Sequence, residues 1–407
     1  MNLASPPTRS LRRSMERCRA LTLGLFDEID RATFCAQAHP DFSPIGWHLG
    51  HIAYTESLWI LERHAGQPPL FPHYQRLFAA DGLPKHDRVC LPTLAEILAY
   101  LEAVRAQVFE YLEVAPAQHE RFWVWLLQHE SQHAETIALV LELLKQRTAP
   151  ASPFLHPAVP PTPQISIPSG EFETGSDAIA ALDNERPRHR VYLEQYNIDR
   201  YPVTCGQYRA FMQAGGYCDR QWWTEAGWAW LQTAQVTQPL YWQDDRKFID
   251  HPVSGVSAFE AEAYARFVGK RLPTEEEWEK AASWNPETLQ CQTYPWGETE
   301  PAEHLVNYGH TIGQTTPVNA YPSGQSPYGC WDMLGNVWEW TASEFVPYPG
   351  FQSYPYRGYS EIYFDGRHQV LRGGSWATRT WALRSTFRNW YYPHVREVLA
   401  GFRCVAR

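Results

Sequence analysis

The sequence lacks any long apolar run and any closely spaced pair of cysteines. No stretch of 18 or more apolar residues occurs, and the best candidate, Thr136 to Leu144, is interrupted by Glu142. We therefore expect no membrane-spanning helix. The eight cysteines lie far apart, without a CxxC pair, at too low a density for a disulfide scaffold. This pattern predicts reduced thiols in a cytoplasmic protein.

Clustered positive charge is also missing. The chain has 35 basic and 45 acidic residues, a formal net charge of −10, and its basic residues are dispersed. Binding to nucleic acid requires a basic face that neutralises phosphates. We therefore expect neither nucleic acid nor a membrane as a partner. The expected partners are small-molecule substrates.

The chain is long enough, and apolar enough, for at least two domains. It has 407 residues, of which 44% are hydrophobic. Up to about residue 147, apolar residues recur at helical spacing. This spacing predicts a four-helix bundle over residues 1–148. The expected helices cover residues 9–36, 44–65, 93–114 and 117–147.

The sequence pattern changes where the second domain begins. Six prolines between residues 149 and 164 predict an interdomain linker. Short β-like runs follow over 165–407, with a helix at Ala258–Val268 and another after Thr274, where Glu277 completes a capping box. The expected fold class is α+β, with little regular secondary structure in the second domain.

The strongest chemical signal is His129-Glu130-Ser131-Gln132-His133 in the last bundle helix. Residues four apart leave nearly the same face of a helix, so both imidazoles can reach one metal ion. His48 and His51, on the second expected helix, are the upstream candidates for a third ligand, and the residues alone leave the choice between them open. Imidazole suits zinc, iron and copper alike.

The same five residues also match the HExxH motif of zinc peptidases. In that interpretation Glu130 is the general base and a third ligand usually lies downstream. Downstream of this helix, however, the chain enters the proline-rich segment, where the nearby histidine is His156. An upstream third ligand is therefore favoured.

Eight segments together resemble the sulfoxide synthases of ergothioneine biosynthesis. These iron(II) enzymes join a DinB-like four-helix bundle to a formylglycine-generating-enzyme-like (sulfatase-modifying-factor) domain, whose architecture is shared with C-type lectins. The resemblance covers nearly the whole chain. It rests on Gly50-His51-Ile52, the His129–His133 segment, Ile167-Pro-Ser-Gly-Glu-Phe, Arg271-Leu-Pro-Thr-Glu-Glu-Glu-Trp-Glu, Tyr294-Pro-Trp-Gly, Gly335-Asn-Val-Trp-Glu-Trp, Leu371-Arg-Gly-Gly-Ser-Trp and Ala400-Gly-Phe-Arg.

The resemblance implies a metal site and a reaction. His51, His129 and His133 would bind Fe(II), and Glu130 would orient an imidazole. His48 would then bond to backbone or face solvent. The implied reaction uses O2 to join a thiol to C2 of the imidazole of hercynine (Nα-trimethylhistidine), giving a sulfoxide and water.

Further roles follow from the same resemblance. A tyrosine between residues 348 and 363 would give a proton to the reacting oxygen, and we favour Tyr356 over Tyr354 and Tyr359. Gln132, Asn389 and Trp390 would bind hercynine, whose trimethylammonium group favours an aromatic wall.

The thiol site departs from the mycobacterial pattern for γ-glutamylcysteine. That pattern has Asp after Asn-Trp and two arginines before Leu-Pro. Here Tyr391 follows Trp390, and Lys85 and Arg88 precede Leu91-Pro92. We therefore expect free cysteine as the thiol, with Arg88 and Arg396 as partners of its carboxylate.

Asn336 and Glu339 match a position where related domains bind structural calcium through oxygen ligands. This resemblance implies a calcium site in the second domain.

Three alternatives remain open at the level of sequence. A selenium donor could replace the thiol, giving a selenoneine synthase. The histidines could instead bind zinc, in a peptidase or in a DinB-type thiol transferase. The chain could also be a non-catalytic binding protein, because fold alone does not determine function.

Overall fold

The computed structural model describes residues 7–116, 119–145 and 162–406 and divides into two compact units, Met1–Thr148 and Ala149–Arg407. Most of the expected linker, 149–161, lies outside the described residues. The first strand after it begins at Gln164.

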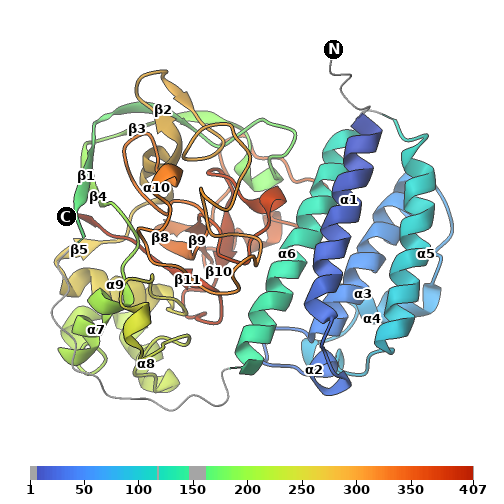
Figure 1. Ribbon diagram of the computed structural model, residues 1–407, viewed down its shortest axis with the longest axis horizontal. Helices are drawn as coiled ribbons and strands as arrows, with labels where there is room; N and C mark the ends of the chain where they lie inside the picture. Colours follow the sequence, from blue (N-terminus) through green and yellow to red (C-terminus); the bar gives the residue numbers. More distant parts are fainter. Residues whose placement is uncertain (1–6, 117–118, 146–161, 407) are drawn as a thin grey trace. The chain divides into compact units, whose positions relative to one another are not determined.

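Four long helices make up most of unit 1 (Figure 1). They are α1 (Pro7–Leu23), α3 (Ile45–Glu56), α5 (Leu94–Leu112) and α6 (Glu120–Lys145). The shorter elements are η1 (Gly24–Phe26), α2 (Arg31–Cys35), the π-helix η2 (Ser57–His64), η3 (Pro72–Tyr74), α4 (Gln75–Phe78) and η4 (Lys85–Asp87). The expected DinB-like helical bundle is therefore present.

The single helix expected over residues 9–36 is wrong. Helix α1 ends at Leu23, and α2 begins only after Asp30. The Asp30 carboxylate accepts a hydrogen bond from the backbone N–H of Thr33 at 2.7 Å. Because an aspartate in this position caps a helix N-terminus, a new helix starts here.

Helix α3 is the central helix of unit 1. Each of its residues except Tyr54 is buried. Gly46 and Gly50 permit close contact with neighbouring elements, because a Cβ atom there would lie 2.5 Å from the ring of Phe34 and 2.2 Å from the ring of Phe78. The π-helix η2 continues directly from α3, a feature often found near functional sites.

Unit 2 contains short strands, as its sequence predicted. One sheet has the order β1-β4-β12-β5 and another the order β10-β9-β8-β11, and two pairs, β2-β3 and β6-β7, complete the set. The pairing of β8 with β11 is parallel. The strands are β1 (Gln164–Ile167), β2 (Gly170–Thr174), β3 (His189–Leu193), β4 (Tyr196–Asp199), β5 (Lys270–Arg271), β6 (Trp284–Asn285), β7 (Gln290–Cys291), β8 (Trp338–Glu344), β9 (Gln369–Arg372), β10 (Asn389–Tyr391), β11 (Ala400–Gly401) and β12 (Val405–Ala406).

Two of the helices in unit 2 agree with the sequence prediction. Helix α9 (Ala258–Phe267) occurs as expected, and α10 (Glu275–Ser283) begins after the predicted capping box of Thr274 and Glu277. The sequence analysis missed α7 (Cys205–Gln213) and α8 (Glu225–Ala234). Both have a threonine N-cap, so a capping signal was present in the sequence.

The core of unit 2 combines apolar packing with buried ion pairs. Trp278 is fully buried in a cluster with Ile198, Met333 and Val405. The fully buried Arg372 pairs with Glu279. Further buried pairs join Arg384 to Glu185, Arg388 to Glu275 and Arg403 to Glu339.

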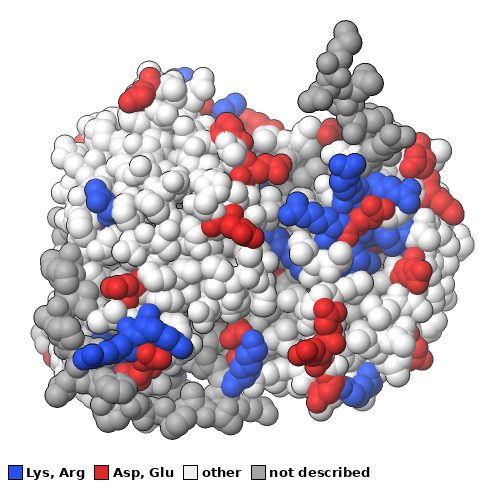
Figure 2. Space-filling model, in the orientation of Figure 1, with Lys and Arg blue, Asp and Glu red and all other residues white. Residues whose placement is uncertain are grey.

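The surface of unit 1 mixes charges of both signs. Figure 2 shows basic side chains over helix α1 with acidic ones among them. Arg12 of this helix pairs with Glu16 and with Glu113. In the described part of the chain, no helix has both the length and the apolarity to cross a membrane. All eight cysteines are free, as predicted.

Candidate metal centre

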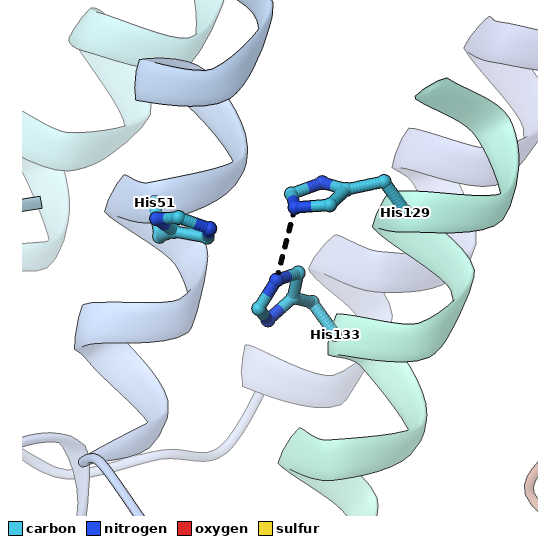
Figure 3. A group of neighbouring side chains, drawn as sticks. All are labelled: His51, His129 and His133. Atoms are coloured by element: carbon cyan, nitrogen blue, oxygen red, sulfur yellow. Dashed lines mark hydrogen bonds between the residues drawn. The ribbon is translucent and has the colours of Figure 1, made fainter. Parts of the chain in front are cut away.

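Three histidines of unit 1 converge on one point. His51 comes from α3, and His129 and His133 come from successive turns of α6 (Figure 3). One ring nitrogen from each lies within 4.8 Å of the others. The two Nε2 atoms of His129 and His133 are 3.2 Å apart. Three nitrogen donors thus face one another at a spacing that a single metal ion can bridge.

The ring of His51 is held in one orientation. Its Nδ1 lies 2.6 Å from the backbone carbonyl oxygen of Phe78. Because a carbonyl only accepts, Nδ1 carries the proton and Nε2 keeps its lone pair for a metal. Trp47 stacks against this ring with the centroids 4.7 Å apart and the planes 14° apart.

Burial keeps these imidazoles neutral. It lowers the pKa of His51 to about 4, against a weaker opposing effect of the Phe78 hydrogen bond. Burial, together with the neighbouring histidines, also lowers the pKa of His129 and His133 well below the usual value. All three are therefore neutral near pH 7 and can donate their lone pairs. Three neutral nitrogens without a carboxylate fit Fe(II), Zn(II) or copper.

His48 lies beside these three histidines, whereas the resemblance implied that it would bond to backbone or face solvent. It is 7% exposed, so it does not face solvent. Its Nδ1 lies 2.9 Å from Nδ1 of His133. Burial is the main cause that lowers the pKa of His48 to about 3, and the positive charge of Arg88 is among the smaller ones.

Glu130 does not orient an imidazole, which corrects the sequence analysis. Its carboxylate accepts hydrogen bonds from Arg19 at 2.9 Å, Arg105 at 3.1 Å and Thr22 at 2.9 Å. Glu56 of α3 bonds to the same two arginines, so a buried network joins α1, α3, α5 and α6. The two arginines hold the pKa of Glu130 at about 2 against the opposing effect of burial. A carboxylate fixed in this way is a poor general base. This argues against the zinc-peptidase interpretation, in which Glu130 is the general base.

Arg88 is buried and bonded within unit 1. Its guanidinium donates to the carbonyl oxygens of Leu83 and Ala80 and to the hydroxyl of Ser43. It also lies 4.1 Å from the ring centroid of Trp47, on which His51 stacks. In this structure Arg88 thus supports the wall of the metal site, and its role toward a thiol carboxylate remains a prediction.

The other expected hercynine ligands lie in two places. Gln132 is half-buried on α6, between the two metal-facing histidines. Asn389 and Trp390 are half-buried on β10, where the Asn389 side chain accepts a hydrogen bond from the Trp390 backbone. Trp390 stacks on Phe345 with the centroids 4.3 Å apart. Their contacts with hercynine remain predictions.

Tyr356 is 38% exposed in the long loop between β8 and β9, and its ring contacts that of Tyr359. Its role as proton donor remains a prediction.

Arg396 and the expected calcium residues are engaged with partners in unit 2. Arg396 bonds to the backbone of Gln238 and pairs with Glu260 at 3.3 Å. Glu339 binds Arg403 and the indole of Trp278, and the amide of Asn336 bonds to Asp332 and Thr316. Carboxylate binding by Arg396 and calcium binding remain predictions.

Sequence reasoning missed the groups that hold the ligands in place. The Phe78 carbonyl is a backbone group, so no residue type signals it. Trp47 and His48 stand within four residues of His51, and their spacing could have suggested that they share its surroundings.

Comparison with known proteins agrees with the two units. The DinB superfamily model matches residues 14–137, and the sulfatase-modifying factor enzyme 1-like domain matches residues 152–407. The structure of PvdO from Pseudomonas aeruginosa is 24% identical and covers 60% of this chain and 93% of its own, with a TM-score of 0.44. The two family matches show that the protein is of the class that joins a DinB-type helical unit to a sulfatase-modifying-factor-type unit.

Full-length relatives define the family. The hercynine oxygenase of Mycobacterium tuberculosis is 40% identical over 411 residues, which cover 96% of each chain. That of Mycolicibacterium thermoresistibile is 40% identical and covers 98% of this chain and 95% of its own. This chain belongs to the hercynine oxygenase family and is therefore an oxidoreductase.

Proposed function

We propose that this protein is an iron(II)-dependent sulfoxide synthase that joins the sulfur of cysteine to C2 of the hercynine imidazole. The observation that carries this proposal is the cluster of three neutral histidines, without a carboxylate, in a hercynine oxygenase family member. When bound there, Fe(II) supplies a redox centre at which O2 can be reduced. A neutral donor set leaves the full +2 charge on the ion, which favours an anionic thiolate ligand.

The overall reaction balances without a further reductant. A thiol S–H and the imidazole C2–H are lost, and a C–S bond and an S=O bond form. One oxygen atom of O2 enters the sulfoxide, and the other leaves as water with the two hydrogens. The thiol and the imidazole supply all four electrons that reduce O2.

The chain's own residues would bind and orient the reactants. His51, His129 and His133 would hold the metal, and Gln132 would offer its amide beside them. Asn389 would offer a second amide to hercynine, and Trp390 a π-face to its trimethylammonium group. Tyr356 would supply the proton that the reduced oxygen requires, which is general acid catalysis.

Free cysteine as the thiol is the finer part of the proposal. It rests on the departures from the γ-glutamylcysteine pattern at Lys85 and Tyr391. Arg88 and Arg396 are the proposed carboxylate partners, and either role requires the guanidinium to exchange or share its present acceptors. A selenium donor would use the same metal-facing site.

The test is product formation by the purified full-length chain loaded anaerobically with Fe(II). Hercynine would be supplied with cysteine, γ-glutamylcysteine or a selenium donor in parallel, with oxygen uptake and product mass measured. We expect oxygen uptake with hercynine and cysteine together, and a product heavier than hercynine by cysteine plus one oxygen atom less two hydrogens. His133→Ala should abolish metal binding and turnover.

Two controls sharpen this test. Tyr356→Phe, which keeps the ring but lacks the hydroxyl, should lower the rate by about 10²–10⁴-fold, whereas Tyr359→Phe should not. A chain that purifies with zinc and consumes no oxygen with any donor would overturn the proposal. If product forms with γ-glutamylcysteine or with a selenium donor but not with cysteine, only the choice of cysteine would be overturned.

A further inference from the structure

The structure contains a fourth histidine, which is buried, beside the three that face one another. His48 lies on α3 one turn before His51, so both side chains leave a similar face of the helix. Its ring centroid is 5.1 Å from that of His133, and its Nδ1 is 2.9 Å from Nδ1 of His133. This distance is that of a hydrogen bond between two ring nitrogens.

The direction of this hydrogen bond follows from the metal-facing nitrogen. His133 turns its Nε2 toward Nε2 of His129, at 3.2 Å, on the inner side of the cluster. To bind a metal through Nε2, a neutral imidazole must carry its proton on Nδ1. That proton then points at His48, whose Nδ1 must accept it. His48 is thereby engaged by a ligand and is not itself a ligand.

We propose that His48 is a positioning residue that holds His133 in its Nδ1–H tautomer and turns its Nε2 toward the metal. His48 would serve His133 as the backbone carbonyl of Phe78 serves His51. Acceptors that orient metal-bound histidines in this way are usually carboxylates, carbonyls or water. In this protein the acceptor is a second imidazole, and the neighbouring carboxylate, Glu130, bonds to arginines.

The inference concerns the metal site and does not depend on the reaction. It applies to any divalent ion that three imidazoles bind. If the chain fails to make the sulfoxide, the effect of His48 on metal affinity remains measurable, so the two proposals fail separately.

Two substitutions with the same number and branching of side-chain heavy atoms, one polar and one apolar, separate hydrogen bonding from packing. In His48→Asn the amide oxygen stands where Nδ1 stands in histidine and can accept the proton of His133. In His48→Leu a methyl group stands there and cannot. Co(II) alone would be titrated into each metal-free full-length protein, with affinity measured by calorimetry.

We expect His48→Leu to weaken Co(II) binding by about 10–100-fold, the usual effect of losing such a partner. His48→Asn should remain close to the wild type. Far-UV circular dichroism and thermal melting of the metal-free variants would establish that both fold. Wild-type affinity in His48→Leu, or equal weakening in both variants, would overturn the proposal.

A second measurement needs no variant that perturbs the fold. In the Zn(II)-loaded wild-type chain labelled with ¹⁵N-histidine, long-range ¹H–¹⁵N spectra distinguish protonated from unprotonated ring nitrogens. We expect a protonated Nδ1 in His133 and an unprotonated Nδ1, without metal bound, in His48. The reverse pattern, or a metal-bound His48, would overturn the proposal.

Discussion

At the scale of single residues, the site depends on where each imidazole carries its proton. A neutral histidine presents one donor and one acceptor, so each ligand needs a partner for the nitrogen that does not bind metal. Phe78 provides that partner for His51, and His48 provides it for His133. The residues around the ligands therefore determine the site as much as the ligands do.

Gly50 matters because it leaves room for Phe78. A Cβ atom at this position would lie 2.2 Å from the buried ring of Phe78, which cannot move aside freely. Alanine favours a helix over glycine by about 1 kcal/mol. We nevertheless expect Gly50→Ala to destabilise the protein by about 1–3 kcal/mol, because overpacking outweighs that gain.

The same substitution should weaken Co(II) binding, because displacement of Phe78 moves the carbonyl that holds His51. Urea unfolding and Co(II) titration would measure the two effects. Gly24→Ala is the matched control, since a Cβ atom there meets nothing within 4 Å. Unchanged stability and affinity in Gly50→Ala would contradict this explanation.

At the scale of elements, a buried ion network joins the four long helices of unit 1. Arg19 of α1 and Arg105 of α5 both bond to Glu56 of α3 and Glu130 of α6. In the sequence, Thr55 directly precedes Glu56, and His129 directly precedes Glu130. The Thr55 hydroxyl lies 3.4 Å from Nε2 of His51. The network therefore ties α3 to α6 close to the metal-facing histidines.

Arg105→Met tests this network. It keeps a long apolar stem but leaves two buried carboxylates with one arginine. Removing one partner of a buried ionic cluster typically costs about 3–5 kcal/mol, and we expect that loss in free energy of unfolding. Arg12→Met removes a half-exposed arginine and should cost less than about 1 kcal/mol. Equal losses in the two variants, measured by urea unfolding, would show that the network adds no particular stability.

At the scale of the whole molecule, the buried histidines couple stability to pH. The pKa of His51 falls from 6.5 to about 4 on folding, so the unfolded chain binds more protons between these values. Stability is then fully present above pH 6.5 and decreases as the pH falls. His48, His129 and His133 act in the same direction. Glu130 adds a further loss below about pH 4.5.

We expect the metal-free protein to lose about 2 kcal/mol from His51 alone between about pH 7 and pH 5. Urea unfolding followed by circular dichroism at a series of pH values would measure this slope. His51→Gln removes one titrating group and should give a shallower slope. Constant or rising stability toward pH 5 would contradict the prediction.

The structure also corrects the expected form of some elements. The apolar pattern continued past Leu23 and so predicted one helix to residue 36, but the Asp30 cap starts a new one. In unit 2, the short helices α7 and α8, of nine and ten residues, were missed although each follows a threonine N-cap. A local capping interaction thus outweighed a periodic pattern at Asp30, and the caps at Thr204 and Thr224 mark two helices that the sequence analysis did not predict.

The sequence by itself indicated the kind of protein and the candidate metal donors. The HxxxH spacing places two imidazoles on one face of any helix, and the ordered motifs of unit 2 indicated its fold. The HxxxH spacing and each single motif are local signals, because each depends on residues only a few positions apart in the chain.

Tertiary structure alone decided what each histidine and carboxylate does. His48 and His51 are three residues apart, and the packing of Gly46 and Gly50 against aromatic rings sets the rotation of α3 that places each of them. Glu130 became part of an ion network because Arg19 and Arg105 reach it from other helices. Contacts between residues far apart in the chain assign these roles, and no local pattern encodes them.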